Sequence, residues 1–95
     1  MALSQIKFVT FVNKWIWKSR EFIKELKEYR EYLVGHIEWI EGEIRKHTDN
    51  EILERLINHR QERIQELEVI KEEIIYSKNK QKYYTEIANQ YNIFG

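Results

Sequence analysis

The feature that most constrains the fold is an apolar rhythm through the first half of the chain, in which steps of three and four residues alternate. The rhythm runs without a slip from Val9 to His47. Its positions are Val9, Val12, Ile16, Ser19, Ile23, Leu26, Arg30, Leu33, Ile37, Ile40, Ile44 and His47. Only a long α-helix that packs on another helix needs this spacing. The sequence therefore predicts a helix over about residues 4–46.

The stretch that follows this helix predicts a turn and the start of a second helix near Asp49. Thr48, with Glu51 three residues later, has the spacing of a capping box, in which two side chains satisfy free backbone N–H groups. Arg45 and Lys46 suit the last turn of the preceding helix, because cations interact favourably with its dipole. The expected inner face of the second helix is Leu53, Leu56, Ile57, Ile64, Leu67, Ile70 and Ile74. The predicted fold is all-α, a long antiparallel helical hairpin with a second helix over 49–76.

The C-terminal part of the chain leaves two alternatives open. Residues 77–82 contain no apolar side chain, so the helix either continues through them or breaks before a short helix over 83–92 that folds back. Tyr84, Ile87, Ala88 and Tyr91 continue the apolar rhythm nearly in phase, which favours a continuous helix. We treat residues 1–95 as one helical-hairpin domain.

Aromatic side chains form a second stripe beside the aliphatic seam of the first helix. The candidate interaction surface comprises Phe8, Phe11, Trp15, Trp17, Phe22, Tyr29, Tyr32 and Trp39. A two-stranded coiled coil needs only the seam, and a large exposed apolar patch is a liability. We therefore expect another contact surface: a second copy in a homodimeric four-helix bundle, which we favour, a folded-back C-terminus, or a different protein. Gly35 and Gly42 lie on the outer side of this helix, as tolerated exposed glycines or as a place where another backbone approaches.

Four polar residues, Ser19, Arg30, Arg60 and Arg63, occupy seam positions. We expect the long side chains to extend outward to water or to pair with nearby Glu residues.

Charge is divided unevenly along the chain, although 16 Lys and Arg balance 16 Asp and Glu. Seven basic residues and one acidic residue lie in segments 1–20 and 77–95, which the hairpin brings together. This candidate basic tip comprises Lys7, Lys14, Lys18, Arg20, Lys78, Lys80 and Lys82. Basic residues interleaved with aromatic ones suit a phosphate backbone, an anionic membrane surface or an acidic protein. The alternative that we favour is that the aromatic residues close the end of the bundle and the lysines are only solvated.

Sequence signals for catalysis and cofactors are missing. The chain has no Cys, no Gly-rich phosphate loop and no Ser-centred nucleophile motif. His36 and His59 could come near one another in a hairpin, and Glu62 would complete a weak metal set, but we favour surface or boundary histidines. We expect no enzyme activity, cofactor or metal. The absence of Cys, of a signal peptide and of a transmembrane segment favours an intracellular, cytoplasmic protein.

These observations favour a small non-enzymatic helical protein that acts through protein–protein interaction, as an adaptor, assembly factor or inhibitor. The composition is also common among small viral and mobile-element products. The first alternative is a nucleic-acid-binding hairpin that uses the basic, aromatic tip. The second alternative, which we favour least, is a peripheral membrane protein.

Overall fold

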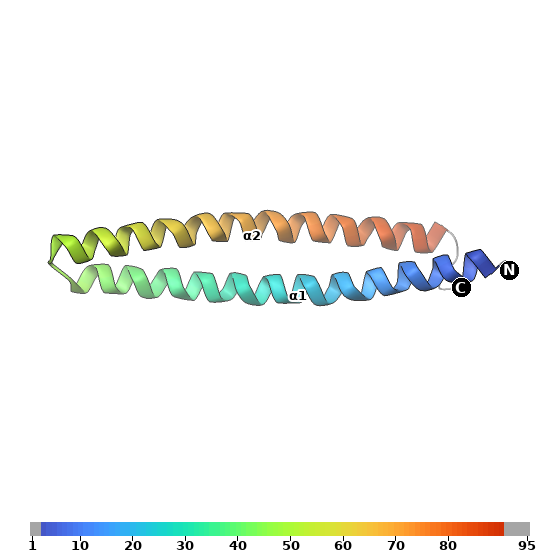
Figure 1. Ribbon diagram of the computed structural model, residues 1–95, viewed down its shortest axis with the longest axis horizontal. Coiled ribbons are helices and arrows are strands. Elements are labelled where there is room, and N and C mark those ends of the chain that lie inside the picture. Colours follow the sequence, from blue (N-terminus) through green and yellow to red (C-terminus); the bar gives the residue numbers. More distant parts are fainter. Residues whose placement is uncertain (1–2, 91–95) are drawn as a thin grey trace. The chain divides into compact units, whose positions relative to one another are not determined.

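The structure, a computed structural model, describes residues 3–90 except for the side chains of residues 3–6 and 9. Helix α1 spans Leu3–Lys46 and helix α2 spans Asn50–Gln90, and the described residues contain no strand. The two helices form a hairpin (Figure 1), so the predicted all-α antiparallel hairpin is confirmed. Tyr91 and the end of the predicted 83–92 segment lie outside the described residues.

Helix α2 is continuous through residues 77–82, as the phase of the apolar positions favoured. The segment contains no Gly or Pro, so every residue in it tolerates helical geometry. Ser77 is only 6% exposed, which shows that a small polar residue occupies a seam position without interrupting the helix. Within the described residues, the fold-back alternative is therefore wrong.

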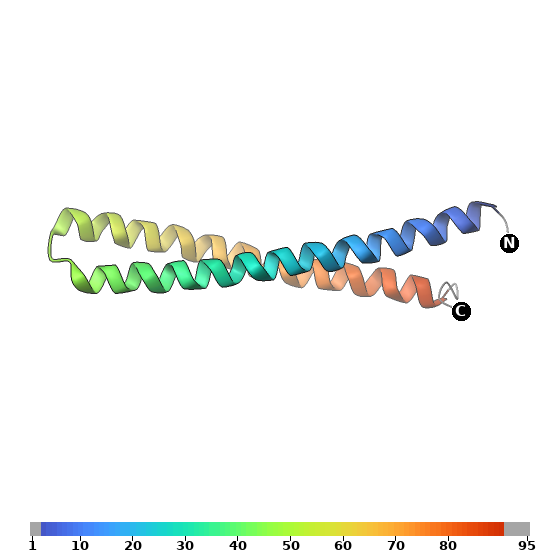
Figure 2. The ribbon, with the colours of Figure 1, turned by 90° about the horizontal axis from the view of Figure 1, so that it is seen from below.

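The hairpin divides into two compact units. The terminal unit comprises residues 1–25 and 74–95, and the turn unit comprises residues 26–73. In each unit a segment of α1 lies beside a segment of α2 that runs in the opposite direction (Figures 1 and 2). Each unit has a small core of its own, because a helix buries only the stripe that faces its neighbour.

The cores of both units are built from the predicted seam. In the terminal unit Val12, Ile16 and Ala88 form a buried cluster, against which Tyr84 packs. In the turn unit Leu33, Ile37 and Leu67 form a second buried cluster, against which Ile64 and Ile70 pack. Each fully buried Leu or Ile contributes roughly 1.5–3 kcal/mol relative to an exposed one. The aliphatic seam of α1 is therefore what holds the hairpin together.

One residue of the expected inner face of α2 was predicted wrongly. Ile57 is 54% exposed, whereas its neighbour Leu56 is half-buried. After Leu56, the next half-buried residues are His59 and Arg60. The inner face of α2 therefore includes these two polar residues and excludes Ile57.

The polar residues at the seam form hydrogen bonds or ion pairs, as expected. The Arg60 guanidinium donates from Nε to Glu41 Oε1 over 3.0 Å, from α2 to α1. Arg63 pairs with Glu66 over 2.7 Å, and the Ser19 hydroxyl donates to the carbonyl of Ile16 over 2.8 Å. These contacts pair polar side chains at the edge of an apolar seam, although Arg63 Nε is buried without a hydrogen-bond partner among the described residues.

The cap of α2 differs from the prediction. Asp49, rather than Thr48, caps the helix: its Oδ1 accepts from the N–H groups of Glu51 over 2.9 Å and Ile52 over 3.2 Å. Because α2 begins at Asn50, Asp49 is the residue just before the first helical position, where such a side chain is most effective. The predicted capping box of Thr48 and Glu51 is therefore wrong, and a cap by Asp49 alone takes its place.

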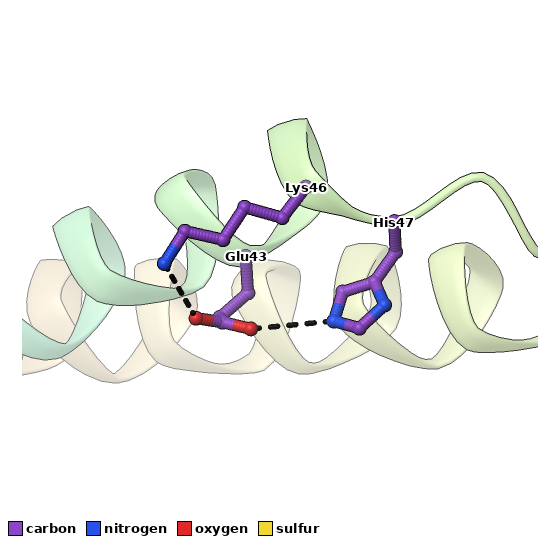
Figure 3. Close-up of polar contacts among 3 residues, drawn as sticks. All are labelled: Glu43, Lys46 and His47. Carbon is purple, nitrogen blue, oxygen red and sulfur yellow. Dashed lines mark hydrogen bonds and ion pairs between the residues drawn. The ribbon is translucent and has the colours of Figure 1, made fainter.

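The end of α1 is stabilised by charge, as predicted from its sequence. Figure 3 shows the Glu43 carboxylate between the Lys46 ammonium, 3.4 Å away, and the His47 imidazole, 3.3 Å away. Arg45 and Lys46 lie in the last helical turn. Cations at this end interact favourably with the partial negative charge of the free carbonyl groups.

Candidate interaction surface

An aromatic ladder lies along α1 in the turn unit. The rings of Tyr29 and Tyr32 stack at 5.9 Å, Tyr32 lies 5.8 Å from His36, and His36 stacks on Trp39 at 5.9 Å. Residues three and four apart share one side of a helix, which explains why these rings meet. Tyr32 and Trp39 remain 60% and 57% exposed. Tyr32 and Trp39 are therefore an ordered part of the ladder that α2 does not cover.

Two side chains of the ladder also contact α2. The Tyr29 hydroxyl donates to Glu66 over 2.8 Å, and the rings of His36 and His59 meet edge to face at 5.2 Å. Tyr29 precedes His36 by seven residues in α1, and Glu66 follows His59 by seven residues in α2. Both pairs therefore fit the same antiparallel register of the two helices. The contact between His36 and His59 was expected from the sequence. The Tyr29 contact was missed, because it depends on that register.

The hydrogen bond from Tyr29 has an electrostatic consequence. It raises the pKa of the Tyr29 phenol above its ordinary value, because the Glu66 carboxylate accepts from the neutral phenol and would repel a phenolate. Partial burial acts in the same direction, and Arg63 opposes it. Tyr29 is therefore held as a neutral hydrogen-bond donor at the edge of the ladder.

Trp15 differs from the other predicted surface residues because it is built into the packing of the terminal unit. Its ring stacks on Tyr84 of α2, with centroids 5.4 Å apart and planes 16° apart. The Lys80 ammonium lies 4.3 Å from the centroid of the Trp15 ring, a cation–π contact. The Phe11 ring meets Trp15 edge to face at 6.5 Å. Trp15 and Lys80 thus serve the hairpin itself.

The remaining predicted residues of the terminal unit are exposed. Phe8, Phe11 and Phe22 are about half exposed, and Trp17 is 63% exposed. We use the name aromatic face of α1 for the exposed members of the candidate surface that share one side of the helix, which are Phe8, Phe11, Phe22, Tyr29, Tyr32 and Trp39. Trp17 lies on a different side of α1, because it is six residues from Phe11 and a helical turn takes about 3.6 residues. Sequence reasoning missed the exposed aliphatic residues of α2, which are Ile52, Ile57, Val69 and Ile75.

The charges of the candidate basic tip are exposed, apart from the half-buried Lys80. The terminal unit carries eight Lys and Arg against three Glu, and the turn unit carries eight against thirteen Asp and Glu. All ion pairs among the described residues lie in the turn unit. The cations of the terminal unit therefore have no carboxylate partner within the described part of the chain.

Glycines leave two open places on the outer side of α1. A Cβ added at Gly35 or at Gly42 would have no heavy atom within 4 Å apart from its immediate neighbours and its own helix backbone. Within the described chain, these positions therefore face open space.

No metal set gathers around the two histidines. His59 lies 3.9 Å from Glu62, but the described residues contain no group of three His, Cys, Asp or Glu side chains that would hold a metal ion. Nor is any helix among the described residues long and apolar enough to cross a membrane. No family model matches the sequence, and neither curated proteins nor solved structures give a significant match to the chain.

Proposed function

We propose that this chain acts by binding protein through the aromatic face of α1, as an adaptor, assembly factor or inhibitor without a catalytic step. The observation that carries the proposal is the exposure of large aromatic side chains after α1 and α2 have packed together, with Tyr32 and Trp39 more than half exposed. Large exposed apolar surfaces in folded proteins mark places where another molecule binds.

The chemistry of this face favours a protein as the partner. Tyr, Trp and Phe are enriched at the centres of protein interfaces, where they fill pockets and exclude water. The stacking of Tyr32, His36 and Trp39 holds these rings in place before binding, so fewer rotamers are lost when a partner docks. The pairing of α1 with α2 along a heptad seam is of the coiled-coil type, and a further helical layer on the aromatic face would make a four-helix bundle.

A photocrosslinking experiment tests this proposal. Trp39 is replaced by the photoreactive amino acid p-benzoylphenylalanine, and in a matched control the same residue replaces Glu54, which is exposed on α2. The variants are irradiated in the cells that naturally produce the protein. We expect the variant with the photoreactive residue at position 39 to form a defined adduct with another protein or with a second copy, and the variant at position 54 to form little adduct. Equal yields at the two positions would show that the aromatic face is not a binding surface.

A second candidate is nucleic-acid binding by the terminal unit, which the unpaired cations favour. Lys14, Lys18 and Lys82 are exposed and suit phosphate contacts, and such binding weakens steeply with salt. The ring of Trp15 is already in contact with Tyr84 and Lys80, which weakens the case for base stacking there. Fluorescence anisotropy with labelled oligonucleotides at low and high salt decides between the two candidates. A cytoplasmic location is part of the proposal and is checked by imaging a fluorescent fusion.

A further inference from the structure

We propose that the outer side of α1 in the turn unit binds the same stripe of a second copy of this chain, with the two α1 helices antiparallel. This inference rests on the proposed function, because it names the occupant of the part of the aromatic face that holds Tyr32 and Trp39. It is carried by a stripe of α1 over residues 28–46, in which aromatic residues alternate with glycines and the two end residues carry opposite charges. The whole stripe lies within the turn unit.

Six residues form this stripe, which we call the outer stripe, at alternating steps of four and three. They are Glu28, Tyr32, Gly35, Trp39, Gly42 and Lys46. At about 100° per residue, this spacing keeps them on one side of α1, nearly opposite the seam that packs on α2. The two aromatic residues are more than half exposed, and a Cβ added at either glycine would meet no atom of another part of the described chain within 4 Å. The outer stripe thus presents two bulky side chains and two open places.

One antiparallel register matches the outer stripe with itself. In a pair with a two-fold axis level with Ile37, residues at equal distances before and after Ile37 lie opposite one another in the two copies. Tyr32 precedes Ile37 by five residues and Gly42 follows it by five. Gly35 precedes it by two and Trp39 follows it by two. Each aromatic residue therefore lies opposite a glycine of the other copy, as the packing of knobs into holes requires.

The same register pairs opposite charges at the ends of the stripe. Glu28 precedes Ile37 by nine residues and Lys46 follows it by nine. Glu28 forms no ion pair among the described residues, and Lys46 contacts only Glu43 there, at 3.4 Å. A parallel pair of helices would place each residue against its own copy, with like charges and bulky rings together. Shape and charge therefore both favour the antiparallel pair.

One flanking residue opposes this pairing. Glu38 is exposed, lies beside the outer stripe and is only one residue from Ile37 in the sequence. The two copies of its carboxylate therefore approach each other near the axis, where like charges repel. Removing this charge should strengthen the dimer, an effect that a loss of folding does not produce.

The interface is small, so we expect a weak dimer. Tyr and Trp side chains carry roughly 150–250 Å² each, so Tyr32 and Trp39 offer on the order of 200 Å² per copy. A standard interface buries about 800 Å² per partner, and much smaller ones belong to transient complexes. We expect a dissociation constant between about 10 μM and 1 mM, so that the dimer forms reversibly with concentration.

Charge variants test the ends and the centre of the stripe. Light scattering over a concentration series measures the dimer dissociation constant of E28K, E28K/K46E and E38Q. We expect E28K to weaken the dimer roughly 5- to 30-fold at low salt, because the altered contact occurs twice across the axis. The exchange variant E28K/K46E restores the dimer, and E38Q tightens it roughly 2- to 5-fold.

Shape variants test the contact between aromatic residues and glycines. G35W places Trp against Trp39 of the other copy, and we expect loss of the dimer. G35W/W39G exchanges the bulky and the small residue, so the register again pairs Trp with Gly and the dimer returns. Trp at exposed Gln61 of α2, the control, leaves the dimer intact. Circular dichroism checks that all three variants keep the helical content of the hairpin.

The orientation is measured with a spin label on an introduced cysteine, which is unique because the chain has none. Thr48 follows Ile37 by 11 residues. Labels at Thr48→Cys are therefore roughly 30–40 Å apart in the antiparallel dimer, from a rise of about 1.5 Å per residue on both sides of the axis. A parallel dimer gives less than about 25 Å, since packed helices lie only 8–10 Å apart. A control label at Val34→Cys, close to the axis, gives a short distance in both orientations.

Three results would overturn the inference. A monomer at every concentration up to about 1 mM removes the second copy as the partner. The crosslink at position 39 then decides separately whether the proposed function survives with a different protein. A short distance between labels at position 48 excludes the antiparallel arrangement. A dimer that G35W and E28K leave unchanged does not use the outer stripe.

Discussion

Replacing Asp49 by Ala tests how the second helix begins. The Asp49 side chain accepts two backbone hydrogen bonds, at 2.9 and 3.2 Å, and places a negative charge at the N-terminus of α2. Removing such a cap costs about 1 kcal/mol. The charge near the helix dipole adds about 0.3–1 kcal/mol at an exposed site. We therefore expect the free energy of unfolding of D49A to fall by about 1.3–2 kcal/mol.

Two matched variants separate these contributions. D49N keeps a capping oxygen and loses the charge, so it should lose only about 0.3–1 kcal/mol. T48A removes a side chain that accepts no hydrogen bond from the helix start, and surface changes of this kind stay within about 0.5 kcal/mol.

The assay is urea unfolding followed by circular dichroism at 222 nm, at one fixed protein concentration because association would add to the apparent stability. With a slope of about 1–2 kcal/mol per molar urea, D49A should lower the midpoint by roughly 0.7–2 M. If T48A costs as much as D49A, the capping role belongs to Thr48 and the assignment of Asp49 is wrong.

Three further predictions use the same unfolding assay. Leu33→Ala removes a side chain that is fully buried in the turn unit and should cost about 2–4 kcal/mol; a cost below 1 kcal/mol would show that the cluster is not a packed core. Gly42→Ala should stabilise the hairpin by about 1 kcal/mol, because the new methyl group meets open space, and a loss of stability would contradict this reasoning. Tyr29→Phe tests the raised pKa: the stabilisation from the neutral phenol is present below the ordinary value of 10.0 and is lost as pH rises through the higher folded value. Stability of the wild type should therefore fall more steeply above pH 10 than that of Tyr29→Phe, and identical slopes would refute the role of the hydrogen bond.

The seam of α1 was predictable because nearly all of its positions carry aliphatic residues. In α2 the corresponding stripe includes Arg60, Arg63 and Ser77, whose burial depends on partners that a one-dimensional pattern does not reveal. Arg60 is held by Glu41 of the other helix, and a count of apolar residues therefore chose Ile57 instead.

The candidate surface shows the same division between local and long-range information. That the first helix carries more aromatic residues than its seam needs was evident from spacing. Which of these aromatic residues pack within the hairpin depends on the residues of α2 that lie opposite them. Trp15 contacts Tyr84 and Lys80 only because of the register between the two helices. The cap was missed for a local reason: Thr48 and Asp49 are adjacent good caps, and the residue at which the helix starts decides between them.

The contacts between α1 and α2 also imply an order of assembly. Glu41 and Arg60 are 19 residues apart in the sequence, whereas Tyr29 and Glu66 are 37 apart. Doubling the length of a closed loop adds about 0.6 kcal/mol of entropic cost, so contacts near the turn form more readily and bring the next pair within reach. During synthesis, α1 is made before α2, so its seam has no partner at first. Each new turn of α2 then packs against residues of α1 that are further from Asp49 in the sequence. Val12 and Ile16 are therefore buried late, because they pack against Ala88 near the end of α2.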